Sequence, residues 1–96
     1  MLSFLPPTPL EVMENLKTNF RQRRKALGYT QEELAIRSGV SLGTLKRFER
    51  TGYISLESLL KLALVLECLN EFVSLCNTKE ENYESINELL SEVKKG

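Results

Sequence analysis

Apolar side chains along the first two thirds of the chain recur three and four positions apart, a spacing that predicts amphipathic helices rather than strands. The first helix is expected to begin after Thr8, because this threonine is followed by a proline and, three positions on, by Glu11. It should run to about Leu27 and end at Gly28 in a left-handed conformation. Residues 1–7 end in two prolines and should be extended. The apolar positions on the inner face of this helix are Met13, Leu16, Phe20 and Leu27.

Two short helices joined by a tight turn are expected next. The first, over 31–38, is opened by a capping box that starts at Thr30. A turn at Gly39 separates it from a second helix over 42–50, which Ser41 caps. The residues expected to face the core from this pair are Leu34, Ala35, Val40, Leu45 and Phe48.

A fourth helix, capped by Ser55 and expected over 56–66, has almost no polar face. An all-round apolar helix has to be buried on more than one side, which a single small domain achieves poorly, so a second copy of the chain is expected as a partner. For 72–76 the pattern leaves two alternatives open, a continued helix or a short β-strand that pairs across the homodimer. The residues expected at the dimer interface are Leu60, Leu64, Phe72, Val73 and Leu75.

These elements predict an all-α bundle of four to five helices, divided into three parts. Residues 1–7 are an extended segment, 8–69 are the main helical domain, and 70–96 are a dimerisation or partner-binding strand with a C-terminal helix. That last helix is amphipathic and is expected over 85–93, after a polar linker at 77–82.

Composition narrows the classes of function. The 96 residues suit one soluble domain, and no apolar stretch approaches the roughly 20 residues that cross a bilayer, so no membrane partner is expected. The chain has no histidine, and its two cysteines, Cys68 and Cys76, are expected to be reduced core thiols of a cytoplasmic protein. No metal site, cofactor or catalytic residue is expected, which argues against an enzyme.

Charge is unevenly distributed, although the formal net charge is zero. Residues 1–53 carry nine basic and five acidic side chains, a balance of +4. Residues 54–96 carry four basic and eight acidic side chains, a balance of −4. The first half of the chain therefore suits a polyanion such as DNA.

Between Leu16 and Leu66 the chain has a joint pattern of residues: Arg24, Leu27-Gly28, Thr30-Gln31, Leu34-Ala35, Gly39-Val40-Ser41, Thr44-Leu45, Phe48-Glu49, Leu59-Leu60, Leu62-Ala63 and Leu66. With this pattern, the segment resembles the lambda-repressor-like (Cro/C1, XRE) helix-turn-helix family. The resemblance implies a helix-turn-helix DNA-binding domain over 8–69 and the function of a sequence-specific transcriptional repressor, in the cytoplasm at the nucleoid. A homodimer on a palindromic, double-stranded operator is then expected, because one such domain alone gives little selectivity.

A narrower similarity rests on Pro7-Thr8-Pro9, Phe48-Glu49 and Leu75-Cys76. The order of these segments resembles that in the HipB antitoxins. This similarity implies an autoregulating antitoxin of a toxin–antitoxin module, with a kinase-type toxin as a second partner. The alternatives are a phage-type or general XRE regulator without a toxin partner, and a protein-interaction module.

The second helix of the pair is the candidate recognition helix. The positions expected to read bases are Ser41, Leu42, Gly43, Lys46 and Arg47. The candidate phosphate contacts, chosen by charge, polar group and placement, are Arg23, Lys25, Thr30, Gln31, Arg37, Thr44, Arg50 and Tyr53. For Thr30, a purely capping role is the open alternative. The family resemblance implies an ion pair between Arg24 and Glu49 that braces the first helix against the recognition helix.

Overall fold

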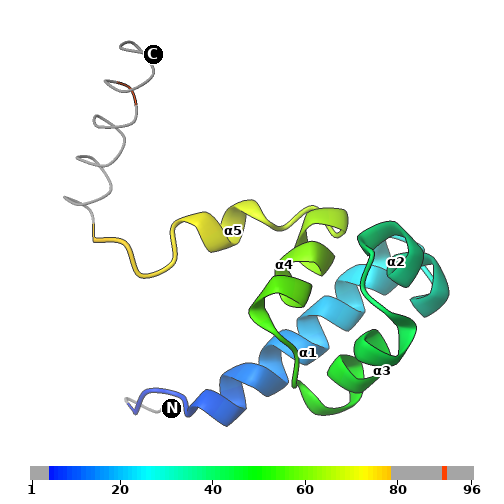
Figure 1. Cartoon of the computed structure of the whole chain (residues 1–96). Helices are drawn as coiled ribbons and strands as arrows, with labels where there is room; N and C mark the ends of the chain where they lie inside the picture. Colours follow the sequence, from blue (N-terminus) through cyan, green and yellow to red (C-terminus); the bar gives the residue numbers. More distant parts are fainter. Residues whose placement is uncertain (1–4, 79–89, 91–96) are drawn as a thin grey trace.

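The computed structural model describes residues 5–78 and Leu90, and this described part contains helices and turns but no strand. The expected all-α class is therefore confirmed. Each of the four longer helices lies within one residue of its expected span. The helix expected over 85–93 falls outside the described residues, apart from Leu90. The helices are α1 (Pro9–Ala26), α2 (Gln31–Ser38), α3 (Leu42–Thr51), α4 (Leu56–Val65) and α5 (Asn70–Val73) (Figure 1).

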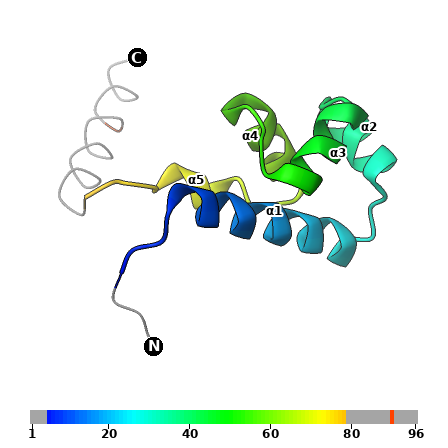
Figure 2. The same ribbon diagram turned by 90° about the horizontal axis from the view of Figure 1, so that it is seen from below.

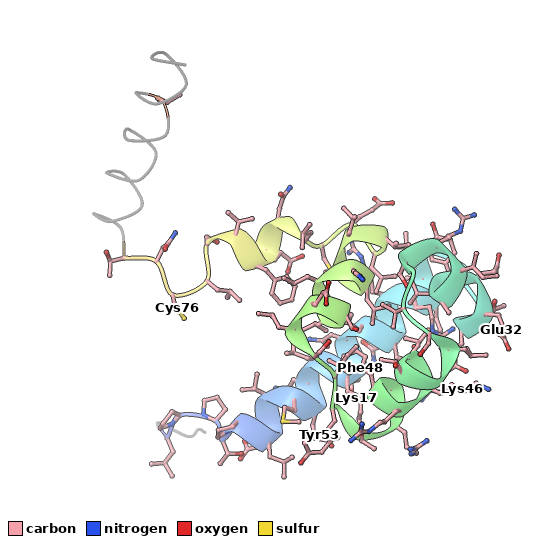
Figure 3. The ribbon with its side chains drawn as sticks, in the orientation of Figure 1. Lys17, Glu32, Lys46, Phe48, Tyr53 and Cys76 are labelled. Atoms are coloured by element: carbon pink, nitrogen blue, oxygen red, sulfur yellow. The ribbon has the colours of Figure 1, made fainter. Side chains whose placement is uncertain are left out.

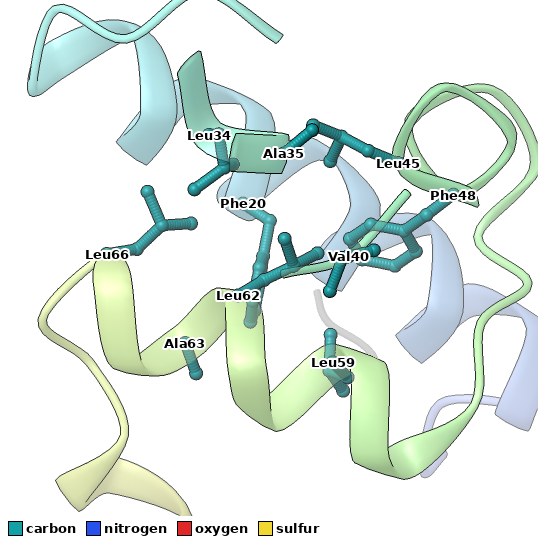
Figure 4. Packing of buried hydrophobic residues seen from close by; sticks show 10 residues of the cluster. All are labelled: Phe20, Leu34, Ala35, Val40, Leu45, Phe48, Leu59, Leu62, Ala63 and Leu66. Carbon is teal, nitrogen blue, oxygen red and sulfur yellow. The ribbon is translucent and has the colours of Figure 1, made fainter. Parts of the chain in front are cut away.

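The four longer helices form two layers. Seen from below, α1 lies along one side, and α2, α3 and α4 lie on the other (Figure 2). Phe20 of α1 meets Phe48 of α3 edge to face, with ring centroids 5.6 Å apart, which is a favoured aromatic geometry. This contact fixes the inner side of α3 against α1. The buried apolar residues of the core are Phe20, Leu34, Ala35, Val40, Leu45, Phe48, Leu59, Leu62, Ala63 and Leu66 (Figure 4).

Local capping determines where the helices begin. At the start of each of α1 to α4, a side-chain hydroxyl accepts a hydrogen bond from the backbone N–H three residues later. The capping residues are Thr8, Thr30, Ser41 and Ser55. At Thr30 the capping box is complete, because Glu33 accepts the Thr30 N–H at 3.0 Å. Gly39, with a φ of 77°, ends α2 in the left-handed region and allows the sharp turn into α3.

Leu27 is the expected core residue that the structure places elsewhere. It is exposed, because α1 ends at Ala26 and Leu27 already belongs to the following turn. α4 buries one side and leaves the other uncovered within the chain, where Leu56 and Leu64 are exposed. The residues of α4 that face the core are Leu59, Leu62 and Ala63.

The segment over 72–76, for which helix and strand were both open, is helical at its start. α5 is a single turn that ends at Val73, and a further turn follows, so the strand alternative is not found in the described residues. The physical reason lies in Phe72, whose ring packs against Phe20 with centroids 6.3 Å apart. Phe72 thus belongs to the chain's own core instead of an exposed strand edge.

Candidate nucleic-acid interface

α3 presents one side to the core and the other to solvent. Leu45 and Phe48 are almost completely buried and anchor the inner side. Lys46 points away from the body of the molecule (Figure 3). The first turn of α3 contains no acidic residue, so no carboxylate of that turn would oppose an anion at the helix N-terminus. The exposed residues of the outer side are Gly43, Lys46, Arg47 and Arg50.

Four of the five predicted base-reading residues are exposed, and Leu42 is the exception. Leu42 is half-buried and packs against the core, so only part of its side chain reaches the surface. Ser41 is held by Thr44: its hydroxyl accepts the Thr44 N–H at 3.2 Å and donates to Thr44 Oγ1 at 2.9 Å. At Gly43, an added Cβ would meet no atom within 4 Å. Packing inside the protein therefore does not require glycine at that position.

The cations on the outer side of α3 are not neutralised by neighbouring carboxylates. Lys46, Arg47 and Arg50 take part in none of the salt bridges found among the described residues. Unpaired cations gathered on one surface raise the local positive potential and attract polyanions. The salt bridges that do form are Lys17–Glu14, Arg24–Glu49 and Lys61–Glu57.

A shallow hollow of about 530 Å³ opens beside α3. Three exposed cations line it, Arg21, Lys46 and Arg50, and within the described chain none of them forms a salt bridge. A surface of this kind suits an anionic group such as a backbone phosphate. The full lining comes from α1, the start of α2 and α3: Arg21, Arg24, Thr30, Gln31, Lys46, Glu49 and Arg50.

Arg21 is the residue of this surface that sequence reasoning missed. Lys17, Arg21 and Lys25 line a second, adjoining hollow, and their i, i+4 spacing places them on one face of α1. That spacing is the signal in the sequence by which Arg21 could have been found. Lys17 already has partners within the chain, because its Nζ donates to the Arg50 carbonyl at 3.3 Å and pairs with the Glu14 carboxylate at 2.7 Å. Arg21 and Lys25 are therefore the available cations of α1 on this face.

Arg24 and Glu49 lie in contact beneath the hollow. Arg24 Nε donates to Glu49 Oε2 at 2.7 Å, and Nη2 donates to Oε1 at 2.9 Å. The two side chains are only 8% and 6% exposed. Arg24 Nη1 also donates to the Tyr29 carbonyl at 2.9 Å, and Gln31 Nε2 donates to Glu49 Oε1 at 2.9 Å. One carboxylate thus ties α1, the start of α2 and α3 together, and the Gln31 amide is turned inward.

Five of the eight predicted phosphate contacts do not line the hollow beside α3: Arg23, Lys25, Arg37, Thr44 and Tyr53. Arg23 donates to the Leu66 carbonyl at 2.7 Å and to the Glu67 carbonyl at 3.2 Å, at the end of α4. Such carbonyls lack partners inside a helix, so the guanidinium satisfies them. Arg37 lies over the Tyr29 ring, 5.0 Å from its centroid. These contacts compete with the phosphate contact expected of each arginine.

Thr30 has the capping role described above and lines the hollow as well. Its Oγ1 accepts the Glu33 N–H at 3.0 Å. The Thr30 backbone N–H, and secondly its hydroxyl, lower the pKa of the Glu33 carboxyl from its usual value. Glu33 is therefore held in its ionised, cap-forming state.

The residues predicted at a dimer interface have different surroundings in the single chain. Leu64, Val73 and Leu75 are exposed, whereas Leu60 is half-buried and Phe72 packs on the chain's own core. The exposed members of this predicted set therefore lie on α4 and around the end of α5.

The two cysteines also differ from each other. Both are free thiols. Cys68 lines an apolar groove between α1 and α5, where burial raises the pKa of its thiol. Cys76 is exposed, contrary to the expected core position, because it follows the single turn of α5 (Figure 3).

A cation-bearing helix held on a helical core, and joined to the preceding helix by a glycine turn, defines a helix-turn-helix DNA-binding domain. The chain belongs to the lambda-repressor-like (XRE) helix-turn-helix family, which it matches over residues 20–68. The protein is a DNA-binding transcription regulator, and this fold is generally non-enzymatic. Neither curated proteins nor solved structures gave a match. None of the helices in the described part combines the length and apolar character that a bilayer crossing needs.

Proposed function

We propose that the protein is a sequence-specific transcriptional repressor that inserts α3 into the major groove of double-stranded operator DNA. An α-helix about 10–12 Å across fits the major groove, which is about 12 Å wide. The proposal rests on a set of cations that form no salt bridge among the described residues. They lie on the outer side of α3 and around the hollow beside it: Arg21, Lys46, Arg47 and Arg50.

Within this proposal, the N-terminal and outer positions of α3 read base edges. Arg47 has the fork of donors that binds guanine O6 and N7 together, a contact that discriminates against other bases by about 1–3 kcal/mol. Lys46 and Ser41 supply single hydrogen bonds. The exposed part of Leu42 meets a thymine methyl group. Gly43 offers no reading group, but it lets the helix backbone approach the bases closely.

The phosphate contacts come from the hollow and from α1. Arg21, Lys25 and Arg50 bind backbone oxygens by charge, and the hydroxyls of Thr30 and Thr44 add hydrogen bonds. Gln31 contributes its backbone N–H at the start of α2, because its side-chain amide is engaged by Glu49. These contacts fix the register of α3 without selecting a sequence.

The experiment that tests the proposal is selection of bound sequences from random duplex DNA, followed by affinity measurements at several salt concentrations. A repressor should enrich a palindrome with half-sites about one helical turn apart. The logarithm of its affinity should fall by about 0.9 per neutralised phosphate for each decade of salt. Lys61→Ala, on α4 in a pair with Glu57, is the matched control and should leave that slope unchanged. Enrichment of no sequence, or an affinity that salt does not change, contradicts the proposal.

The proposal includes an isologous homodimer that uses the uncovered apolar residues of α4 and α5. A two-fold dimer reads two half-sites, which gives the selectivity that one small domain lacks. Leu64→Ser should shift the protein from dimer to monomer in analytical ultracentrifugation. Ile36→Ser, at an apolar position on α2 that is even more exposed, is the control and should leave the dimer intact. A wild-type protein that stays monomeric at micromolar concentration with DNA present contradicts the dimer.

The finer proposal is an autoregulating, HipB-like antitoxin that binds a kinase-type toxin and acts in the cytoplasm at the nucleoid. Its support is the similarity at Pro7-Thr8-Pro9, Phe48-Glu49 and Leu75-Cys76; the last pair lies in a turn here instead of a strand. The test is co-purification from the native host, identification of the bound protein, and growth assays with that protein expressed alone and together with this chain. A chain that binds its operator but no toxin favours the phage-type or general XRE alternative. Loss of a bound protein on deletion of residues 80–96 favours the interaction module.

A further inference from the structure

The end of α3 is tied to the residues that follow it by a single hydroxyl. Thr51 Oγ1 donates to the Arg47 carbonyl at 2.7 Å and accepts the Tyr53 backbone N–H at 3.1 Å. The backbone of Tyr53 is therefore fixed relative to the helical turn that carries Arg47. Tyr53 itself lies at the outer edge of the molecule (Figure 3), and the residue is 54% exposed.

Gly52 makes this path of the chain possible. Its φ of 82° is left-handed, and its N–H donates to the Phe48 carbonyl at 2.8 Å. A Cβ at this position would lie 3.2 Å from the Met13 carbonyl oxygen of α1. The turn after α3 is thus pressed against α1, and it delivers Tyr53 to one defined place beside the helix.

At that place the Tyr53 ring meets the guanidinium of Arg47. Arg47 Cζ lies 6.0 Å from the ring centroid, within the range of a cation–π contact. Arg47 forms no salt bridge in the described chain, so no carboxylate holds the guanidinium in place. We propose that Tyr53 is a positioning residue, whose ring holds the Arg47 guanidinium in the orientation that reads one base pair. The inference rests on the proposed DNA-binding function.

Stacking against a ring and reading a base pair use different parts of a guanidinium. A guanidinium stacked on a ring uses the face of its plane, and its N–H donors lie in the plane. Stacking therefore leaves the donor edge available for guanine O6 and N7. An unrestrained arginine loses much rotamer freedom when it binds, and a ring that restricts it beforehand reduces that loss. The expected benefit at an exposed site corresponds to about a two- to fivefold change in affinity for the preferred base pair.

The phosphate contact that the sequence suggested for Tyr53 is the competing role, and the two roles depend on different atoms. A phosphate contact needs the phenolic hydroxyl, because the oxygen of the phosphate accepts its hydrogen. A positioning role needs only the ring. Tyr53→Phe keeps the ring and removes the hydroxyl, whereas Tyr53→Ala removes both.

The experiment uses the full chain and the duplex that the wild-type protein selects from a random library, with each base pair replaced in turn. Arg47→Ala identifies the base pair at which discrimination is lost. Tyr53→Ala should reduce discrimination about two- to fivefold at that same base pair and leave the salt dependence of affinity unchanged. Tyr53→Phe should discriminate as the wild type does. In the double variant with Arg47→Ala, loss of the ring should have no additional effect. Thermal unfolding of each variant establishes that it is folded under the binding conditions.

Three results would overturn the inference while leaving DNA binding intact. In the first, Tyr53→Ala discriminates as well as the wild type. In the second, Tyr53→Phe loses affinity equally for all sequences and has a smaller salt slope, which assigns the hydroxyl to a phosphate. In the third, the effects of Tyr53→Ala and Arg47→Ala are additive, which shows that the two residues act independently. A wild-type protein that selects no sequence instead overturns the proposed function itself, and the positioning role with it.

Discussion

Removal of Glu49 should destabilise the fold far more than it alters base recognition. Its carboxylate accepts two hydrogen bonds from Arg24 and a third from Gln31, in a place where its side chain is only 6% exposed. In Glu49→Ala, Arg24 keeps the Tyr29 carbonyl as a partner, but its charge stays buried without a counter-ion. Breaking a buried pair in this way costs about 3–5 kcal/mol. The whole folding free energy of such a domain is roughly 5–15 kcal/mol.

The assay is urea and thermal unfolding followed by circular dichroism. A loss of this size should lower Tm by on the order of 10–30 °C in a domain of this length. Glu57→Ala is the matched control, because Glu57 pairs with Lys61 at 3.7 Å while its side chain is 82% exposed. An exposed pair of this kind contributes less than about 1 kcal/mol.

A double variant separates the cost of an unpaired charge from the worth of the pair itself. Arg24→Met combined with Glu49→Leu replaces both charges by apolar side chains of similar volume. Such replacements are often neutral or stabilising, so the double variant should recover most of the loss. Two results would contradict this prediction. In one, Glu49→Ala lowers the free energy of unfolding no more than Glu57→Ala does. In the other, the double variant is as unstable as Glu49→Ala.

Three further predictions follow from other parts of the structure. Gly43→Ala should raise the free energy of unfolding by about 0.5–1 kcal/mol and weaken operator binding. The added Cβ has room within the protein but stands where DNA approaches. A gain in both the free energy of unfolding and the affinity for operator DNA contradicts this. Glu33→Gln should destabilise most at neutral pH. The pKa of Glu33 is lowered in the folded state, so its contribution is present above its unfolded pKa and is lost as pH falls through the folded pKa; a stability difference that does not shrink in acid contradicts this. Arg21→Ala should reduce the salt slope of DNA binding by about 0.9, equally for all sequences, in anisotropy titrations; an unchanged slope removes Arg21 from the interface.

Helix boundaries were predictable from the sequence because they depend on neighbouring residues. Thr30 and Ser41 each cap a helix through a backbone N–H three positions later, and Gly39 supplies the left-handed turn between those helices. The buried faces of the helices were predictable from the spacing of apolar side chains three and four positions apart. Leu27 was misplaced because a shift of one residue at the end of α1 moved it from the stripe to the turn.

The parts that sequence reasoning missed depend on contacts between distant segments. Arg21 joins the candidate site only because α1 packs across α3, and Gln31 turns inward only because Glu49 lies within reach. Phe72 becomes a core residue because α5 folds back toward Phe20. Periodicity records which face of a helix is apolar, but it does not record which helix lies opposite.

The buried contact between Arg24 and Glu49 also limits how this gene can change over generations. A mutation at either position alone leaves a buried charge without a counter-ion, so the protein loses much of its folding free energy until a compensating change is acquired. We therefore expect the two positions to be replaced together or not at all. Arg21 and Lys25, which form no salt bridge in the described residues, are under no such restriction and can each be replaced by a single substitution.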